Sequence, residues 1–447
     1  MKKFGILLAV FLCLGWILPV TATASTPSGL LAQQALAGHG DYEGTAKAGV
    51  LYEMNTDTLV YAYQPDLRIS PTGIVKVLTA LIALEEGNLD DVVTVRRSTL
   101  DSVSPGAVSA GLKAGEEISL RDLLYCIMVS SANDACAVVA EHIAGSQQAF
   151  VEKMNARAAT LGCANTHFTN VHGLSDANQY STARDLALIT VEALGNLRFT
   201  QLFGVTEYTV PATNKSAART LHTTNFMMNP DSPYFDARVT GGKPAAVTTQ
   251  DRSLVCVAEQ EGSRYLCVVM SAQAKVSGGA VTSYTNFKEG SKLLNLGFEG
   301  FAVQQVLGAG QNFGLYPVEG GENHVVVTPE ADVFALLPVK FDSSKLQLEP
   351  QMDSAALTAP VQAGQAVGTL QVRYNGVPIG SVRLLAGHDV ALAGSVIQTA
   401  DRNPGKGGIS PVAIIGILAL AALAGVVLWR RSAGKKRETD GTRRQRK

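Results

Sequence analysis

Two long, uncharged, apolar stretches lie near the ends of the chain, at residues 4–20 and 409–429. The first follows Met1-Lys2-Lys3 and leads into small residues that include Ala22 and Ala24. A short basic start, an apolar run and an A-x-A exit are typical of a secretory signal, so we predict a signal peptide at 1–24. The alternative is an uncleaved N-terminal membrane helix, which the A-x-A pattern disfavours.

The second stretch is long enough to cross a bilayer, because at about 1.5 Å per residue it covers the roughly 30 Å hydrocarbon layer. Residues 430–447 are rich in Lys and Arg, with Glu438 and Asp440 as their acidic residues. Such basic clusters stay in the cytoplasm, which disfavours a buried core helix here. We therefore predict one transmembrane helix at 409–429 and a basic cytoplasmic tail at 430–447. The rest of the mature chain is expected on the extracytoplasmic face of a bacterial cell membrane.

Between these ends, the first part of the chain mixes helical and strand patterns. Ala- and Leu-rich segments with apolar residues three to four apart predict helices at 78–86, 120–144 and 181–194. Runs of β-branched residues around polar turns predict two hairpins, 46–52 with 59–63 and 255–258 with 265–271. Strands at both ends with helices between them favour an α+β domain, which we place at 41–298.

The helical pattern ends near residues 297–301. Beyond it, short strand-like runs at 325–327, 333–337, 369–374 and 379–384 are separated by Gly, Asn and Asp. This pattern predicts a small all-β sandwich domain at 302–392. Residues 393–408 contain Asp401-Arg402-Asn403-Pro404-Gly405 and are expected to link that domain to the membrane helix.

Charge and cysteine content narrow the picture. The formal net charge is -1, and the basic excess is concentrated in the tail, so nucleic acid is not an expected partner and the tail is expected to face anionic lipid. Of the 6 cysteines, Cys13 lies in the predicted signal peptide. The others are odd in number and irregularly spaced, so the sequence does not predict a set of disulfide bonds. Cys256 and Cys267 flank a predicted turn and could pair, although small buried apolar roles are the favoured interpretation.

Three short clusters in the first domain carry residue types suited to acyl transfer. Residues 70–81 read S-P-T-G-I-V-K-V-L-T-A-L, with Lys76 near the start of a predicted helix. Ser131-Ala132-Asn133 follows a tight apolar run, and residues 239–245 read V-T-G-G-K-P-A. An acyl-serine enzyme needs a serine at a helix start beside a lysine, a second serine that relays protons, and a strand lysine for the substrate carboxylate.

These clusters resemble the S-x-x-K, S-x-N and K-T-G motifs of the D-Ala-D-Ala carboxypeptidases, the low-molecular-mass penicillin-binding proteins. Pro71, Lys76, Thr79 and Ala80 set the register against the family pattern P-A-S-x-T-K-I-M-T-A-L. Residues 168–174 (F-T-N-V-H-G-L) and 180–185 (Y-S-T-A-R-D) resemble further family segments, and 357–370 resembles its C-terminal sandwich domain.

The resemblance implies a penicillin-binding/β-lactamase-like catalytic domain with specific roles for four residues. Lys76 and Ser131 correspond to catalytic residues, and Asn133 and Lys243 correspond to substrate-binding residues. No cofactor is implied. A metal-assisted route is not expected either, because no His, Asp and Glu set has ligand spacing.

The nucleophile position of the first cluster is occupied by Gly73. A glycine has no side chain, so no acyl-enzyme can form there. Thr72 would point about 100° away around a helix, and Ser70 lies before the helix start. The one serine three residues before a lysine is Ser432, beyond the predicted membrane helix, which we attribute to chance.

The third cluster also departs from the family pattern. Pro244 stands in place of the motif threonine, which removes a hydroxyl and a backbone N–H, and proline is expected to fit poorly in a strand that pairs with substrate. Ala245 adds a methyl group where glycine allows close approach. Gln179 replaces a family histidine, so His172 is expected to be a structural hydrogen-bonding residue rather than a catalytic base.

Three functional hypotheses follow. The first is a peptidoglycan-metabolism protein with impaired or lost catalysis that binds stem peptides ending in D-Ala-D-Ala, or scaffolds other wall enzymes. The second is an active serine-type carboxypeptidase that trims such stem peptides, with Ser131 as an unconventional nucleophile or a sequence error at Gly73. The third is an interaction protein whose all-β domain carries the function.

Overall fold

The computed structural model describes residues 30, 34–37, 44–246, 251–321 and 324–393. The predicted signal peptide, membrane helix and basic tail lie outside these residues, as does the predicted linker apart from residue 393. Within the described ranges, no helix has the length and apolar character needed to cross a bilayer.

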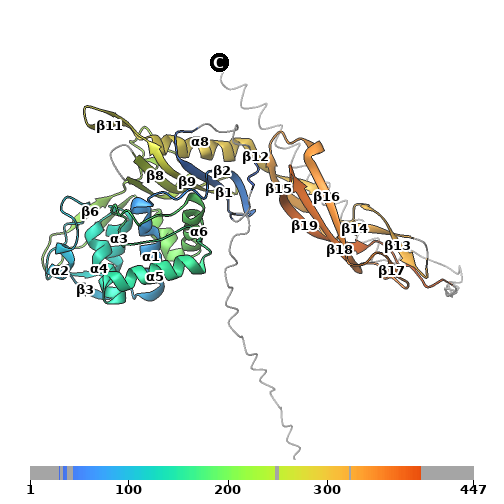
Figure 1. The fold of residues 1–447 in the computed structure, drawn as a ribbon, viewed down its shortest axis with the longest axis horizontal. Helices are drawn as coiled ribbons and strands as arrows, with labels where there is room; N and C mark the ends of the chain where they lie inside the picture. The colour runs from blue at the N-terminus through green and yellow to red at the C-terminus, as the bar shows by residue number, and fades with distance from the viewer. Residues whose placement is uncertain (1–29, 31–33, 38–43, 247–250, 322–323, 394–447) are drawn as a thin grey trace, which may run out of the picture. The chain divides into compact units, whose positions relative to one another are not determined.

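The first domain is built on a 5-stranded antiparallel sheet with the strand order β2-β1-β9-β8-β7. Strand β1, from the start of the domain, pairs with β9 near its end, so the two predicted hairpins lie side by side in one sheet (Figure 1). Positive φ angles at Glu261 and Gly262 form the tight turn between β8 and β9. The strands are β1 (Ala48–Glu53), β2 (Thr58–Tyr63), β7 (Val239–Ala246), β8 (Asp251–Gln260) and β9 (Ser263–Gln273).

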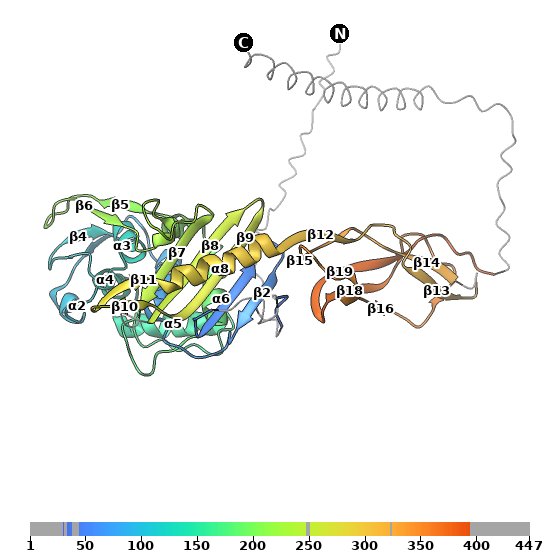
Figure 2. The same cartoon turned by 90° about the horizontal axis from the view of Figure 1, so that it is seen from above.

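Helices cover both faces of this sheet, as expected for an α+β domain. Helix α8 (Thr285–Gly300) lies along one face, and Figure 2 shows it crossing β8 and β9. The other face carries the larger helical layer, with α6 (Ala183–Leu194) packed against β9 and β1. The remaining helices are α1 (Lys76–Glu86), α2 (Arg97–Asp101), α3 (Leu120–Met128), α4 (Asn133–Ala144), α5 (Gln147–Thr160) and α7 (Leu197–Phe203).

Helix α1 runs through the centre of the helical layer. Every residue from Lys76 to Leu84 is buried, which explains why its sequence is apolar all round rather than amphipathic. A 3₁₀ turn, η3 (Thr72–Val75), precedes it, so the helix begins two residues before the predicted start at residue 78. Because η3 leads directly into α1, Gly73 lies about one turn before Lys76.

The prediction of a single helix at 120–144 was wrong. The structure has two helices, α3 and α4, separated by residues 129–132. Ser131 has a φ of 63°, in the left-handed region that cannot continue a right-handed helix. The amide of Asn133 donates instead to the carbonyl of Val108, which caps α4 from a neighbouring loop. The break directs Ser131 toward η3.

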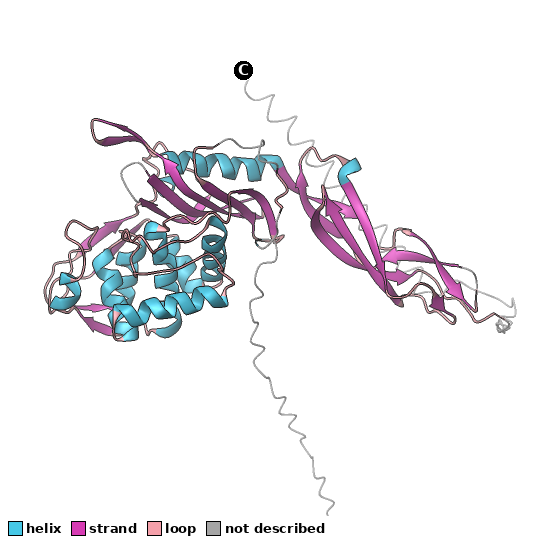
Figure 3. Ribbon diagram, viewed as in Figure 1, coloured by secondary structure: helices cyan, strands magenta, loops and turns pink. Residues whose placement is uncertain are grey.

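Strands make up almost all of the second domain, as predicted (Figure 3). A 2-stranded sheet, β12-β15, accompanies a 6-stranded sheet with the order β16-β18-β19-β14-β13-β17. Inward residues alternate along β14 and β18 and form a separate apolar core. The strands are β12 (Phe301–Leu307), β13 (Gly314–Glu319), β14 (His324–Pro329), β15 (Val333–Pro338), β16 (Leu346–Met352), β17 (Leu357–Thr358), β18 (Ala366–Tyr374) and β19 (Val377–Ala386).

The cysteines among the described residues are all buried and free. Cys256 and Cys267 lie directly opposite each other on β8 and β9, and both are fully buried. They pack as small apolar residues in the sheet, which agrees with the favoured interpretation of the sequence.

Candidate functional site

Lys76 is the first residue of α1 and lies in the interior of the first domain, with 2% of its surface exposed. Its ammonium donates to Asn133 Oδ1 at 2.9 Å and to the carbonyl of His172 at 2.6 Å. Burial lowers the pKa of this amine below its ordinary value, because removal from water disfavours the charged form. The structure thus joins the first and second predicted clusters through one buried hydrogen bond.

Asn133 is held in place from two sides. Its Nδ2 donates to the carbonyl of Val108 at 3.0 Å, while its Oδ1 accepts from Lys76. The next residue, Asp134, fastens the same loop by accepting from Ser109 Oγ at 2.6 Å and from the amide of Ala110 at 2.9 Å. Neither Asp134 nor this loop was predicted from the sequence, although an acidic residue directly after S-x-N was an available signal.

Gly73 lies in η3, facing these residues. A β-carbon built on it would be 3.5 Å from Lys76 Nζ, 3.7 Å from Ser131 Oγ and 3.5 Å from the methyl of Ala245. All three are ordinary van der Waals distances, so a side chain at this position would fit without displacing its neighbours. The surroundings of a nucleophile are therefore assembled around a residue that has no side chain.

The hydroxyls of Thr72, Ser130 and Ser131 are the nearest in sequence to Gly73 and to the S-x-N cluster. Thr72 is 1% exposed, and its Oγ1 is buried with no hydrogen-bond partner among the described residues. Its φ of 51° is unusual for a β-branched residue. Ser130 Oγ donates to the carbonyl of Cys126 at 2.9 Å. Ser131 is the hydroxyl that lies beside Lys76 and Gly73.

Lys243 lies in β7 and is fully buried, with its ammonium 3.3 Å from the carbonyl of Met128. Burial and the nearby charge of Lys76 lower the pKa of Lys243 to about 7. The strand continues through Pro244 to Ala246 and pairs with β8 along this length. The physical reason is that β7 is an edge strand, where proline interrupts no central ladder.

His172 has a structural position, as the sequence suggested. Its Nδ1 accepts from the amide of Leu174 at 3.2 Å, and its carbonyl accepts from Lys76. Burial, and then the charge of Lys76, lower the pKa of its imidazole to about 4, so the ring is neutral near pH 7. Gln179 is buried and accepts from the amides of Thr169 and Asn170, which fixes the same loop.

Gly173 is a second site residue that was not predicted from the sequence. Its φ is 84°, and a β-carbon on it would overlap the carbonyl oxygen of Thr72 and lie 2.8 Å from the amide nitrogen of Gly73. The loop that carries His172 can therefore approach η3 only with glycine at this position. The sequence signal was the glycine within residues 168–174.

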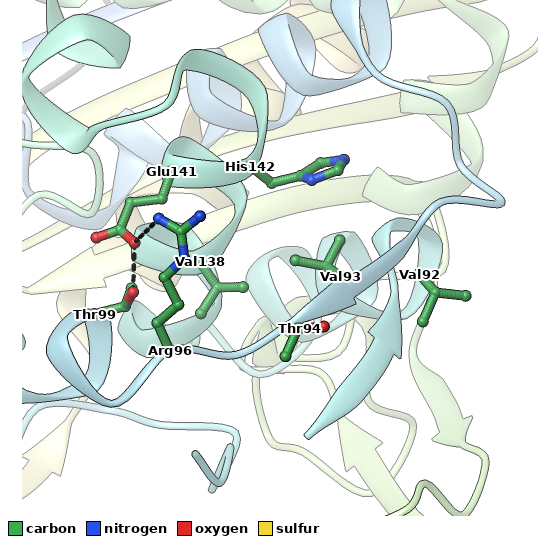
Figure 4. A pocket seen from close by; sticks show the side chains of 8 residues that line it. All are labelled: Val92, Val93, Thr94, Arg96, Thr99, Val138, Glu141 and His142. Atoms are coloured by element: carbon green, nitrogen blue, oxygen red, sulfur yellow. Dashed lines mark hydrogen bonds and ion pairs between the residues drawn. The ribbon is translucent and has the colours of Figure 1, made fainter. Parts of the chain in front are cut away.

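A separate pocket of about 300 Å³ lies at the other end of α4 (Figure 4). It is lined by Val92, Val93, Thr94, Arg96, Thr99, Val138, Glu141 and His142. Its polar groups are already paired, since Glu141 accepts from Thr99 and lies 4.0 Å from Arg96. Because none of the predicted site residues lines this pocket, we assign the functional site to the cluster around Lys76 instead.

The structure brings Gly73, Lys76, Ser131, Asn133 and Lys243 into one cluster. Within the described ranges, no group of His, Cys, Asp and Glu side chains is arranged to hold a metal ion. A helix-start position beside a buried lysine, with a serine and an asparagine from a helix break and a lysine from a sheet edge, is the arrangement of an acyl-serine penicillin-binding domain. These features define the class of protein.

Comparison with known protein families identifies the family within this class. A family model described as D-alanyl-D-alanine carboxypeptidase, peptidase S11, matches residues 34–274. A second model, described as the C-terminal domain of penicillin-binding protein 5, matches residues 301–392. The chain belongs to the D-alanyl-D-alanine carboxypeptidase family, as its motifs indicated, and is a carboxypeptidase-like penicillin-binding protein of peptidoglycan metabolism.

Individual relatives agree with this assignment. The chain is 29% identical over 360 residues to the D-alanyl-D-alanine carboxypeptidase DacA of Haemophilus influenzae, covering 78% of this chain and 86% of that protein. It is 28% identical over 356 residues to DacF of Bacillus subtilis, covering 78% and 87%. Among solved structures, penicillin binding protein 5 from Haemophilus influenzae matches with a TM-score of 0.58 and 29% identity, covering 78% of this chain and 98% of that one.

Proposed function

We propose that this protein is a membrane-anchored, extracytoplasmic member of the family that binds peptidoglycan stem peptides without acyl transfer. One observation carries the proposal. The nucleophile position is Gly73, while Lys76, Ser131, Asn133 and Lys243 remain gathered around it. The relatives named above are D-alanyl-D-alanine carboxypeptidases, which makes a peptide ending in D-Ala the expected ligand.

Both halves of this proposal rest on the geometry of the cluster. Acyl-serine catalysis requires a hydroxyl between the lysine and the second serine, and Gly73 supplies none. Binding of a peptide carboxylate requires hydrogen-bond donors and a positive charge but no nucleophilic hydroxyl. Lys76 and Lys243 provide these donors and this charge. The methyl of Ala245 and the missing N–H of Pro244 further disfavour the pairing of substrate along β7.

The direct test is covalent labelling of the purified exterior part, residues 25–408, with a fluorescent penicillin. We expect no label that survives denaturation, whereas the Haemophilus influenzae DacA protein, as the positive control, should be labelled. A stoichiometric adduct that hydroxylamine removes would show that an acyl-enzyme forms and would overturn the proposal. In parallel, a D-Ala-D-Ala peptide should bind saturably, as measured by calorimetry, with no release of D-Ala.

A second candidate is an active carboxypeptidase that uses Ser131. The observation in its favour is that the Ser131 hydroxyl lies beside Lys76, 3.7 Å from the β-carbon position of Gly73. This candidate predicts release of D-Ala from a D-Ala-D-Ala peptide and loss of that release in Ser131→Ala. Release that persists in Ser131→Ala would instead indicate a contaminating enzyme.

A scaffolding role of the all-β domain has one supporting observation. Large apolar side chains are exposed on this domain, namely Val303, Leu315, Phe334 and Val339. Val303 and Phe334 lie on the paired strands β12 and β15, and an exposed apolar surface can mark a protein contact. Deletion of residues 302–392 would test this role, because it should remove a partner or a localisation while peptide binding by the first domain persists.

Anchoring and export are part of the proposal and rest on the sequence alone. The apolar stretch at 409–429, followed by the basic tail at 430–447, supports a single C-terminal membrane helix with its end in the cytoplasm. The signal at 1–24 supports export of the rest. We expect the full chain in the membrane fraction and a chain truncated after residue 408 in the medium or periplasm. Protease added to intact spheroplasts should digest the exterior part.

A further inference from the structure

Lys76 and Lys243 bring two buried amines into the site without an acidic partner. They are 2% and 0% exposed, and within the described part of the chain neither forms an ion pair. The thiol of Cys136, which interacts with both amines, supplies no negative charge because burial raises its pKa to about 11. A buried ammonium without an opposite charge is costly, and an anionic ligand would lower that cost.

Both lysines also have donors to spare. An ammonium group has three N–H donors. Two N–H groups of Lys76 donate to Asn133 Oδ1 and to the carbonyl of His172. One N–H group of Lys243 donates to the carbonyl of Met128. One donor of Lys76 and two of Lys243 are therefore left for a ligand by the described residues.

The free donor of Lys76 and the hydroxyl of Ser131 meet at Gly73. The β-carbon position of Gly73 lies 3.5 Å from Lys76 Nζ and 3.7 Å from Ser131 Oγ. The Ser131 hydroxyl makes no hydrogen bond to any described residue, and its backbone is held at a φ of 63°. Strain of this kind persists where the surrounding structure imposes it, commonly at binding sites. Gly73 and Ser131 are both partly exposed, so a ligand can reach them.

The chemistry of acyl transfer indicates which ligand has an oxygen at this point. An acyl-enzyme is an ester, R–CO–O–CH₂–, whose single-bonded oxygen and carbon belong to the serine. The trimmed peptide is the free acid, R–COO⁻, which has an oxygen in the same place and no attached carbon. A serine side chain would collide with that extra oxygen, whereas glycine leaves room for it.

We propose that the site preferentially binds stem peptides that have already lost their terminal D-Ala, with one carboxylate oxygen beside Gly73, between Lys76 and Ser131. The inference rests on the proposed function and narrows it, since the ligand is the product of a carboxypeptidase rather than its substrate. The negative charge of this product would lie beside the buried amine of Lys76, where the untrimmed peptide has a neutral amide. The protein would thus distinguish trimmed from untrimmed stem peptides by binding the trimmed ones more tightly.

The test compares two synthetic peptides on the purified exterior part, residues 25–408. One is diacetyl-L-lysyl-D-alanine and the other is diacetyl-L-lysyl-D-alanyl-D-alanine, both measured by isothermal titration calorimetry. We expect the shorter acid to bind at least about tenfold more tightly, a difference of roughly 1.4 kcal/mol. Its C-terminal amide, which has no charge, should lose that advantage.

Gly73→Ala supplies the decisive variant, because its methyl would occupy the space of the carboxylate oxygen while making no close contact with the protein. We expect it to fold normally and to lose the preference for the shorter acid. Gly49→Ala in β1, whose β-carbon would also meet only ordinary contacts, is the matched control and should keep the preference.

The outcomes separate this inference from the proposed function. Tighter binding of the D-Ala-D-Ala peptide, or equal binding of both, would leave the proposed function standing and overturn the preference for trimmed peptides. An unchanged preference in Gly73→Ala would likewise overturn the placement of the carboxylate. Binding of neither peptide would refute both proposals together.

Discussion

The ammonium of Lys76 lies 3.5 Å from the point where a side chain on Gly73 would begin. This distance and the hydrogen bonds of Lys76 to Asn133 and His172 preserve the surroundings of an acyl-serine site around a residue that cannot be acylated. Lys76 and Ser131 therefore lie around the Gly73 position although it has no side chain. The proposed binding role of this site can be tested one residue at a time.

The first prediction concerns restoration of the nucleophile. Gly73→Ser should be tolerated by the fold, because its β-carbon would meet only ordinary van der Waals contacts. We expect it not to restore release of D-Ala from a D-Ala-D-Ala peptide, since Pro244 and Ala245 still alter the strand that pairs with substrate. The combined variant Gly73→Ser, Pro244→Thr, Ala245→Gly should restore measurable release. Robust turnover in the single variant would show that β7 is not limiting.

The second prediction concerns the buried hydroxyl of Thr72. Thr72→Val should raise the free energy of unfolding by about 1 kcal/mol, because it removes a polar atom that has no partner among the described residues. Thr79→Val is the matched control: the Thr79 hydroxyl donates to the carbonyl of Val171 at 2.7 Å, so its loss should cost about 1–2 kcal/mol. Urea unfolding of both variants measures the two changes. Equal destabilisation would indicate that Thr72 has a hidden partner.

The third prediction concerns the approach of the His172 loop to η3. Gly173→Ala should lower the free energy of unfolding by more than about 3 kcal/mol, because the methyl would strain a left-handed backbone and overlap the carbonyl of Thr72. Gly162→Ala isolates the backbone part, since Gly162 has a φ of 80° and open space around it; its cost should be about 1–2 kcal/mol. Similar losses in the two variants would contradict the close contact.

The fourth prediction concerns the buried amine of Lys243. Burial, and then the charge of Lys76, give it a pKa of about 7 in the folded chain, against roughly 10.4 for an unperturbed lysine. Between these values the unfolded chain binds more protons, so this amine makes the free energy of unfolding rise with pH. Lys243→Met should therefore stabilise the chain most near pH 6, by on the order of 2–5 kcal/mol, and progressively less toward pH 10.

Urea unfolding of the wild type and Lys243→Met at pH 6, 8 and 10 checks this dependence. Lys275→Met, at an exposed lysine of the β10 strand (Lys275–Ser277), is the control and should show no comparable trend between pH 6 and 9. A stability difference between wild type and Lys243→Met that is the same at pH 6 and pH 9 would contradict a lowered pKa of the Lys243 amine.

Local sequence was sufficient for several elements and for the family. The apolar run after Lys76 predicted α1, and the turn at Glu261 and Gly262 predicted the β8–β9 hairpin, because both depend on short-range periodicity and turn chemistry. The motif spacing likewise identified the family and predicts that Gly73 occupies the nucleophile position. The absence of a side chain at Gly73 follows from the amino-acid sequence itself and does not depend on how the chain packs.

Only the tertiary structure decided how these pieces meet. The helical pattern of residues 120–144 does not reveal the break between α3 and α4. At this break Ser131 has a left-handed backbone conformation, which its intrinsic propensity does not favour. The burial of Lys243, the tolerance of Pro244 at a sheet edge and the need for glycine at 173 all arise from contacts between segments far apart in the chain. Such contacts leave no local pattern. The sequence alone determined that the hydroxyl is absent, and the fold determined that the charges around it remain in place.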